Sequence, residues 1–156
     1  MSLAAGTLLC TGCSKDDNKD SSAAMSSAGS VTGSAAAETK ISTQNGDITV
    51  SGRILAKYTE MGGPEGALNQ PTGSSVSGPD GGSCQEFVGG AICYSEKTGP
   101  HVVWGEIRKA WEADGGVNGK LGYPTTDEKD ITGGKQSDFT AGSISWVDNR
   151  TSVSTK

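Results

Sequence analysis

The sequence predicts an α+β domain of two tandem repeats, each built from a short helix, a Gly/Pro turn and a β-hairpin, after a disordered N-terminal tether. Three observations predict this architecture. All eight Trp, Tyr and Phe residues lie after residue 40, so residues 41–156 hold the material of a core. The same residue pattern occurs twice there, and each copy passes from helical apolar spacing to strand-like alternation. The foldable part, residues 41–156, has about 116 residues, which is enough for one small core and not for two.

Residues 1–13 resemble the end of a bacterial lipoprotein signal peptide. The stretch is small and apolar, and Thr11 and Gly12 stand directly before Cys13, as in a lipobox whose cysteine becomes the lipid-modified N-terminus. No Lys or Arg precedes the apolar stretch, although a signal peptide ordinarily begins with a positive region. The alternative is a redox or metal pair of Cys10 and Cys13, but a lone Cys-x-x-Cys is a weak signal. We expect lipidation of Cys13 and contact with the membrane through that lipid only.

Residues 14–40 predict a disordered linker rich in Ser and Ala. They contain no aromatic residue and almost no large apolar side chain, so they cannot bury enough surface to offset the entropy of ordering. Together with a lipid at Cys13 they would form a tether that holds the folded domain, residues 41–156, off the membrane surface. No apolar run in the chain approaches the ~20 residues of a membrane-spanning helix.

The folded part contains two copies of one residue pattern, at about residues 50–98 and 103–151. From Gly52 to Pro71 each matched residue recurs 53 positions later, and from Phe87 to Tyr94 the offset is 52. The matched pairs are Gly52/Gly105, Gly62/Gly115, Gly63/Gly116, Leu68/Leu121, Pro71/Pro124, Phe87/Phe139, Gly90/Gly142, Ile92/Ile144 and Tyr94/Trp146. So many matches in the same order predict two copies of one structural unit.

Each copy begins with a short amphipathic helix. Ile54, Tyr58 and Met61 stand at positions i, i+4 and i+7 and therefore share one helix face. Ser51 is a plausible N-cap, and the Gly-Gly pair at 62–63 supplies a left-handed stop. Helices of two to three turns are marginal alone, so packing must stabilise them.

A turn with the pattern Leu-x-x-Pro follows each helix. It reads Leu68-Asn69-Gln70-Pro71 in the first copy and Leu121-Gly122-Tyr123-Pro124 in the second. Asn replaces Gly at the second position, and Asn is among the non-glycine residues that best tolerate a positive φ. The turn therefore predicts a positive φ at Asn69 and Gly122.

A β-hairpin ends each copy. A two-residue loop at 88–89 places Cys84 opposite Cys93, at a close pair that does not share backbone hydrogen bonds. A disulfide between them would contribute about 2.5–3 kcal/mol in the loop-entropy model and requires an oxidising compartment. Two separate free thiols are the alternative. The core face of the hairpin would hold Phe87, Ile92 and Tyr94, matched by Phe139, Ile144 and Trp146.

Over about residues 48–151 the chain resembles the LGFP repeat family of actinobacterial envelope proteins. The resemblance rests on the order of the motifs, which is a helix, Gly-Gly, Leu-Gly-x-Pro and Phe-x-x-Gly-x-Ile-x-Trp. The segment 121–124 carries the naming motif with Tyr in the aromatic slot, and residues 100–107 resemble the junction between copies; the segment 68–71 and the two hairpin cysteines depart from the pattern. LGFP repeats occur as appendages to mycolyl-transferring and hydrolytic enzymes, and attachment to the cell wall is ascribed to them. The resemblance implies a lipid-anchored, extracytoplasmic envelope protein without an enzyme domain.

Composition argues against several classes of function. The net charge of −5 and the lack of a basic stripe argue against nucleic acid as a partner. His101 is the only histidine, and no Gly-x-Ser-x-Gly elbow follows a strand, so a small wall hydrolase with His101 as its base is only a third alternative. Asp127, Glu128 and Asp130 cluster without the spacing of an EF-hand. We expect no enzyme activity, no cofactor and no metal.

The two copies serve as controls for each other when binding residues are sought. Aromatic residues present in both copies are explained by core packing. Trp104 aligns with Ser51, and Tyr123 aligns with Gln70, so the shared core requires neither. We predict a ligand face of Trp104, Tyr123 and His101 that binds cell-wall glycan, with packing between the copies as the alternative for Trp104. The alternative function is an accessory subunit that docks on another envelope protein.

Overall fold

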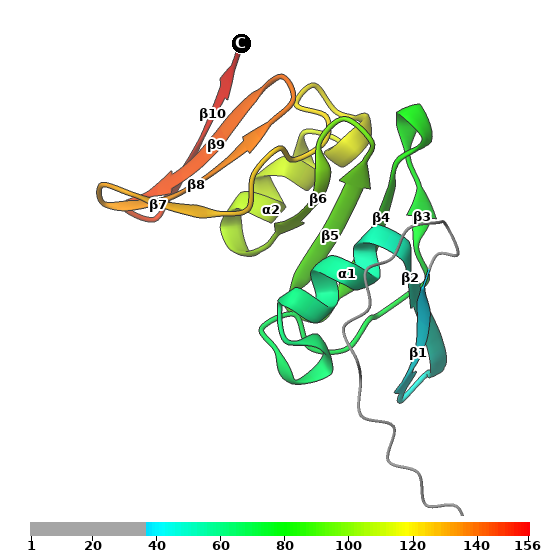
Figure 1. Ribbon diagram of the computed structural model, residues 1–156. Coiled ribbons are helices and arrows are strands. Elements are labelled where there is room, and N and C mark those ends of the chain that lie inside the picture. The colour runs from blue at the N-terminus through cyan, green and yellow to red at the C-terminus, as the bar shows by residue number, and fades with distance from the viewer. Residues whose placement is uncertain (1–36) are drawn as a thin grey trace, which may run out of the picture. The chain divides into compact units, whose positions relative to one another are not determined.

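The computed structural model describes residues 37–156 and confirms a mixed α+β fold that is mostly β. Within these residues two α-helices and ten strands form three antiparallel sheets (Figure 1). The helices are α1 (Gly52–Glu60) and α2 (Gly105–Ala113), with the short 3-10 helices η1 (Gly63–Glu65), η2 (Pro79–Gly81) and η3 (Gly116–Asn118). The strands are β1 (Glu38–Thr43), β2 (Gly46–Ser51), β3 (Val76–Ser77), β4 (Ser83–Phe87), β5 (Gly90–Ser95), β6 (Gly99–Val103), β7 (Lys129–Ile131), β8 (Gly134–Phe139), β9 (Gly142–Val147) and β10 (Arg150–Thr155). The expected lipid site at Cys13 and most of the linker lie outside the described residues.

Helices and sheets alternate. Helix α1 packs between the β1–β2 hairpin and the sheet of order β3-β4-β5-β6, and α2 packs between that sheet and the sheet of order β10-β9-β8-β7 (Figure 1). One core surrounds α1 and consists of Val50, Ile54, Tyr58, Leu68, Phe87, Ile92 and Val102. The other surrounds α2 and consists of Cys93, Val103, Ile107, Trp111, Leu121, Tyr123, Phe139 and Ile144. The expectation of a single small core was therefore wrong, because each helix packs on its own face of the sheet between them. In the described part of the chain, neither helix has the length and apolarity that crossing a bilayer requires.

The sheets are larger than the sequence predicted. Each expected hairpin, β4–β5 and β8–β9, has gained a further strand on either side, so each repeat contributes a four-stranded sheet. The β1–β2 hairpin was not predicted, and Glu38, Thr39 and Lys40 lie in β1 and not in the linker that was expected to extend to residue 40. These added strands are short or rich in Gly, Ser, Thr and charge, so no apolar alternation marks them; neighbouring strands stabilise them by pairing.

The hairpin register is the one that the sequence predicted. Cys84 pairs with Cys93 and Phe87 with Gly90, and a disulfide joins the two cysteines at a Cα–Cα distance of 4.1 Å. In the second repeat Gln136 pairs with Ser145 at the matching place. The disulfide was therefore predicted correctly, both in its pairing and in its absence from the second copy.

Both faces of the first four-stranded sheet are buried. Along β5, Ile92 belongs to the core around α1 whereas Cys93 belongs to the core around α2, and along β6 Val102 and Val103 divide in the same way. The corresponding outer face of the second sheet carries polar residues in place of the disulfide, among them Gln136 and Ser145.

The aromatic residue of each helix holds the Leu-x-x-Pro turn. The Tyr58 hydroxyl donates to the carbonyl oxygen of Asn69 at 2.8 Å, and Trp111 Nε1 donates to that of Gly122 at 2.9 Å. Asn69 and Gly122 have φ values of 59° and 70°, so the predicted positive φ is confirmed. Ser51 occupies the N-cap position of α1, but its hydroxyl makes no capping hydrogen bond, so that part of the prediction was wrong.

Aromatic stacking completes the two cores. Tyr58 stacks on Phe87 with ring centroids 4.7 Å apart, and Trp111 stacks on Phe139 at 5.8 Å. These paired aromatics pack in the cores, as the comparison of the two copies predicted. The Gly-Gly stops are also present, since Gly62 and its counterpart in the second copy both have positive φ.

Candidate functional site

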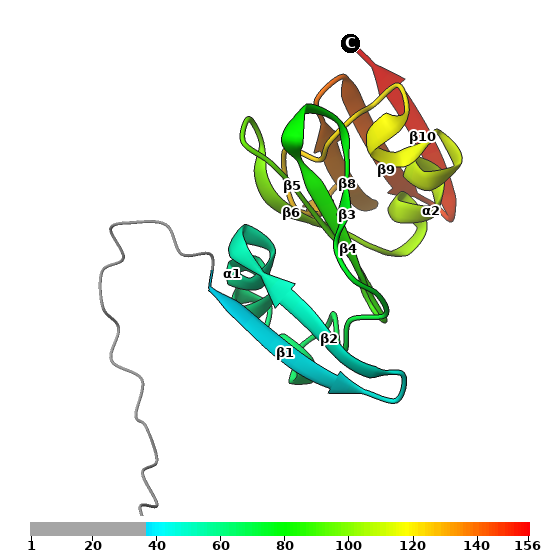
Figure 2. The same cartoon turned by 90° about the vertical axis from the view of Figure 1, so that its right-hand side faces the viewer.

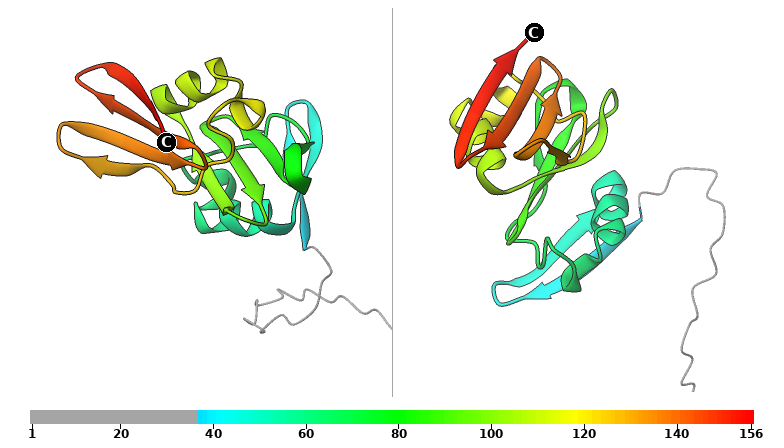
Figure 3. Two further views of the ribbon diagram at one scale, coloured as in Figure 1. Left: turned by 90° about the horizontal axis from the view of Figure 1, so that it is seen from above. Right: turned by 90° about the vertical axis from the view of Figure 1, so that its left-hand side faces the viewer.

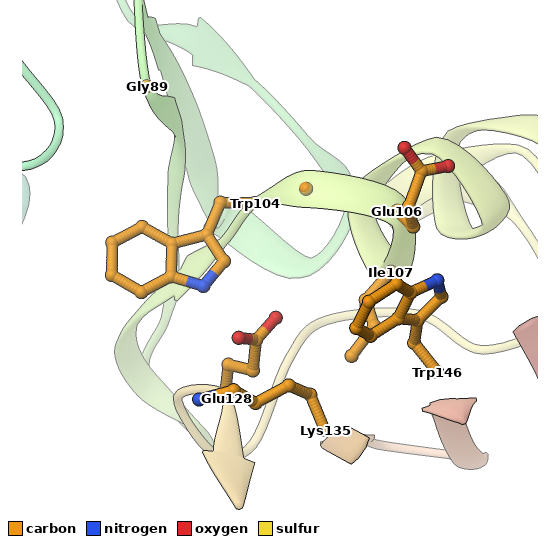
Figure 4. A pocket seen from close by; sticks show the side chains of 8 residues that line it. Gly89, Trp104, Glu106, Ile107, Glu128, Lys135 and Trp146 are labelled. Atoms are coloured by element: carbon orange, nitrogen blue, oxygen red, sulfur yellow. The ribbon is translucent and has the colours of Figure 1, made fainter. Parts of the chain in front are cut away.

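A pocket of about 360 Å³ lies where the second sheet meets the start of α2 (Figure 4). Its lining residues come from both repeats and are Gly89, Trp104, Gly105, Glu106, Ile107, Glu128, Lys135 and Trp146. Figure 4 shows the indoles of Trp104 and Trp146 on opposite sides, with the Glu128 carboxylate between them. The volume is in the range of small-molecule sites, about 300–1,000 Å³.

Trp104 reaches the pocket because the junction between β6 and α2 is tightly specified. It is the N-cap residue of α2 in an extended conformation, and the following Gly105 has a φ of 59°. Gly90 on β5 leaves room for it, because a Cβ at Gly90 would lie 2.9 Å from the Cβ of Trp104 and 2.9 Å from the carbonyl oxygen of Val103. One side of Trp104 packs against the core around α1, so the packing that the sequence left open as an alternative does occur, together with its place in the pocket.

The second repeat supplies the opposite wall and the charges. Trp146 projects from β9 and packs partly against the core around α2. Lys135, on β8, forms an ion pair with Asp130 at 2.5 Å, and this hydrogen bond raises the pKa of the Lys135 ammonium. Among the described residues no hydrogen bond or ion pair engages the Glu128 carboxylate. The pocket therefore combines two indole surfaces with a carboxylate acceptor and an ammonium donor.

This combination suits a polyhydroxylated ring. Indole faces are apolar and carry a negative quadrupole, so they pack well against the C–H groups of a sugar. A carboxylate accepts and an ammonium donates hydrogen bonds, and a few such groups in an apolar pocket fix the orientation of a ligand. Within residues 37–156 no group of three or more His, Cys, Asp or Glu residues could hold a metal ion.

Tyr123 does not lie with Trp104, and the predicted face of three residues does not form. Its side chain is only 6% exposed and belongs to the core between the repeats. Its hydroxyl donates to the carbonyl oxygen of Pro79 at 2.9 Å, and burial, with a contribution from the charge of Asp80, raises its pKa. Tyr123 touches a different cavity, which Trp104 does not line. At the matching position of the Leu-x-x-Pro turn the first copy has Gln70.

His101 also lies apart from the pocket, in a contact between the repeats. Its Nε2 is 2.8 Å from the carbonyl oxygen of Thr98, and its Nδ1 is 3.5 Å from Oδ1 of Asp127. The same Asp127 oxygen accepts a hydrogen bond from the backbone N–H of Val102 at 2.8 Å, and its other oxygen accepts one from Lys57 at 2.6 Å. His101 is therefore part of an inter-repeat polar cluster.

Sequence reasoning missed Trp146, Glu128 and Lys135. Trp146 was assigned to the core because it matches Tyr94; in the structure it packs partly against the core around α2 and also lines the pocket. The signal that could have found the site is the unmatched Trp104, since a large aromatic residue at one junction only must meet something in the following repeat. The partners across the junction depend on the fold and left no pattern in the sequence.

Comparison with known proteins adds one finding. The model of the LGFP repeat matches residues 68–119 and 121–153, which together make up more than half of the chain. The two matches begin at Leu68 and Leu121, at the first residue of each Leu-x-x-Pro turn. A comparison with the curated proteins found no match.

Proposed function

Because the chain belongs to the LGFP repeat family, we propose that it is a non-catalytic protein of the cell envelope that binds cell-wall glycan in the pocket between Trp104 and Trp146. LGFP repeats are typical of cell-envelope proteins and form a non-catalytic repeat family. The observation that carries the proposal is the pair of tryptophans around a pocket that also holds a carboxylate and an ammonium group. The disulfide supports it, because such bonds persist outside the cytoplasm.

Sedimentation with delipidated, protein-free cell wall tests this function. We expect the full chain to pellet saturably, and Trp104→Ala or Trp146→Ala to weaken pelleting about tenfold or more, since buried indoles dominate interface energies. Glu128→Gln should weaken it without disturbing the packing of either indole.

The matched control is Val153→Ala, which shortens an apolar side chain that is 50% exposed and lies outside the pocket. Thermal unfolding of every variant separates lost binding from lost folding. Pelleting that is absent in the wild type, or unchanged in folded Trp104→Ala, would overturn the glycan proposal.

We also propose that Cys13 carries a lipid and that the chain is anchored to the membrane by it alone. The support is the Thr11-Gly12-Cys13 sequence. In bacterial cells Cys13→Ser should move the protein from the membrane to the soluble fraction, whereas Cys10→Ser should leave it in the membrane. Membrane recovery of Cys13→Ser would contradict the anchor.

The alternative function, an accessory subunit that docks on another envelope protein, is favoured by a different surface. An open pocket beside β1 carries apolar side chains that nothing in the described residues covers. This surface does not overlap the pocket between the tryptophans, so the two functions are compatible and can be tested separately.

A further inference from the structure

Another pocket lies between β1 and α1, away from the pocket between the tryptophans. Its volume is about 320 Å³. The lining residues are Thr39, Ile41, Leu55, Tyr58, Thr59, Gly62, Gly63 and Pro64. Ile41 and Leu55 pack only partly against the core around α1, so both retain accessible apolar surface. Figure 2 shows β1 on the outer side of its hairpin.

The second helix shows what fills the position that is equivalent to this pocket, because α1 and α2 occupy matching places in the two repeats. Since β1–β2 precedes α1 as β5–β6 precedes α2, Ile41 corresponds to Cys93 and Leu55 to Arg108. By the same offsets Tyr58 corresponds to Trp111, and Pro64 to Val117. Every wall of the pocket therefore has a counterpart around α2.

Around α2 the counterpart is filled by strand β4 and the loop before it. Cys84 of β4 is bonded to Cys93, and Glu86 of β4 forms an ion pair with Arg108. Gly78 of the loop lies so close to Val117 that an added Cβ would be 3.2 Å from its methyl group. The interface inside the chain thus shows that a strand belongs in a pocket of this kind.

The backbone beside the pocket is open to such a strand. In the sheet of the first repeat β5 lies between β4 and β6. In the described part of the chain β1 pairs only with β2, and the right-hand view of Figure 3 shows this hairpin in cyan. A strand edge of this kind presents unpaired N–H and C=O groups, which are a template for strand addition. The edge and the pocket are adjacent, because Thr39 and Ile41 contribute to both.

The pocket beside α1 lacks the charged side chains that its counterpart beside α2 has. Leu55 stands where the second repeat has Arg108, and Thr59 stands where it has Glu112. An acidic side chain such as Glu86 therefore has no cation to meet in the first pocket. An apolar side chain fits instead.

We propose that an extended segment of a partner protein adds antiparallel to the free edge of β1, as β4 adds to β5. Two alternate side chains of this segment enter the pocket. One lies opposite Ile41, as Cys84 lies opposite Cys93, and the next but one is apolar and packs against Leu55. This interaction goes beyond glycan binding and uses none of the residues of the pocket between the tryptophans.

A peptide copied from β4 tests the proposal. The probe is residues 82–88 with Cys84→Val and Glu86→Leu, carrying a fluorescent label, and it is titrated into the full oxidised chain while anisotropy is recorded. We expect saturable binding, and binding about tenfold or more weaker for the same peptide with Glu86 retained, because burying an unpaired carboxylate is costly.

The matched variant is Leu55→Arg, which copies the second repeat. It should reverse the preference, so that the peptide with Glu86 binds more tightly than the peptide with leucine. Trp104→Ala should leave peptide binding unchanged, which separates this proposal from the glycan function. Absent binding, or equal preference in the wild type and Leu55→Arg, would overturn the proposal.

Disulfide trapping tests the register. A peptide that retains Cys84 should crosslink to the Ile41→Cys variant and not to Lys40→Cys, because only residue 41 lies opposite. Equal crosslinking at both positions would overturn the strand geometry. A concentration-dependent dimer that the peptide dissociates would assign the edge to a second copy and overturn the partner assignment.

Discussion

Asp127→Asn will lower the free energy of unfolding by about 2–3 kcal/mol, because it leaves the buried Lys57 ammonium with only the exposed Glu60 carboxylate, 3.0 Å away, as a counter-charge. Lys57 is only 7% exposed and reaches from α1 to Asp127, which lies 70 residues later in the chain. The amide keeps an oxygen for the backbone N–H of Val102, so the substitution removes the charge and little else. We place the effect below the 3–5 kcal/mol of a fully buried pair because the Asp127 side chain is 42% exposed.

Urea unfolding with a matched control measures this effect. Asp130→Asn removes a carboxylate from the neighbouring exposed ion pair with Lys135 and should change stability by less than about 0.5 kcal/mol. Adding Lys57→Met to Asp127→Asn should recover most of the loss, because the buried ammonium that has lost its Asp127 partner is then gone. An Asp127→Asn variant as stable as Asp130→Asn would show that the inter-repeat ion pair contributes nothing.

The same pair predicts how stability depends on pH. Burial would raise the pKa of Asp127, but hydrogen bonds from Lys57 and the Val102 backbone outweigh it and hold the pKa below 3.8. Burial would lower the pKa of Lys57, but Asp127 and Glu60 raise it above 10.5. The contribution of Asp127 is therefore present above its unfolded pKa and lost as pH falls through the lower folded value. The contribution of Lys57 is present below its unfolded pKa and lost as pH rises through the higher folded value. The difference between wild type and Asp127→Asn should accordingly stay constant from about pH 5 to 9 and shrink in acid.

This ion pair also marks the limit of what the sequence could predict. Hairpin register, the disulfide and the positive φ of Asn69 follow from local spacing, and the structure has all three. Ala110 and Ser74 stand at the positions in the other copy that match Lys57 and Asp127. Comparison of the two copies therefore could not predict this ion pair. Contacts between repeats are specified by the fold as a whole.

The added strands were missed for a related reason. β6 contains Gly99 and Pro100, and β10 is exposed along its whole length, so neither carries the apolar alternation that identifies a strand. Their pairing with β5 and β9 depends on the hairpin edges that those strands offer. The edge of β1 that faces away from β2 is an edge of the same kind, and a further strand can pair with it in the same way.

Tyr123→Ala will lower the free energy of unfolding by about 3–4 kcal/mol, an effect on folding and not on ligand recognition. The ring fills the space between the repeats, where an added Cβ at Gly82 would lie 2.4 Å from its hydroxyl oxygen. Tyr123→Phe keeps the ring and loses the hydrogen bond to Pro79, so it should cost about 1 kcal/mol. Gln70→Ala, at the same motif position of the first repeat, is the matched control and should change stability by less than about 0.5 kcal/mol.

Wall sedimentation of Tyr123→Phe then decides between structure and binding. Because the Tyr123 hydroxyl is held by Pro79 and the side chain is buried, the folded variant should pellet with cell wall as well as the wild type does. Trp104→Ala should fail in the same assay while remaining folded, since Trp104 lines the pocket and is only partly buried. If Tyr123→Phe kept its melting temperature and lost wall binding, Tyr123 would belong to the ligand face after all. The aromatic slot of the Leu-x-x-Pro turn would then serve recognition. The expected opposite result makes that slot the contact by which one repeat packs on the preceding one, and leaves recognition to the junction tryptophan.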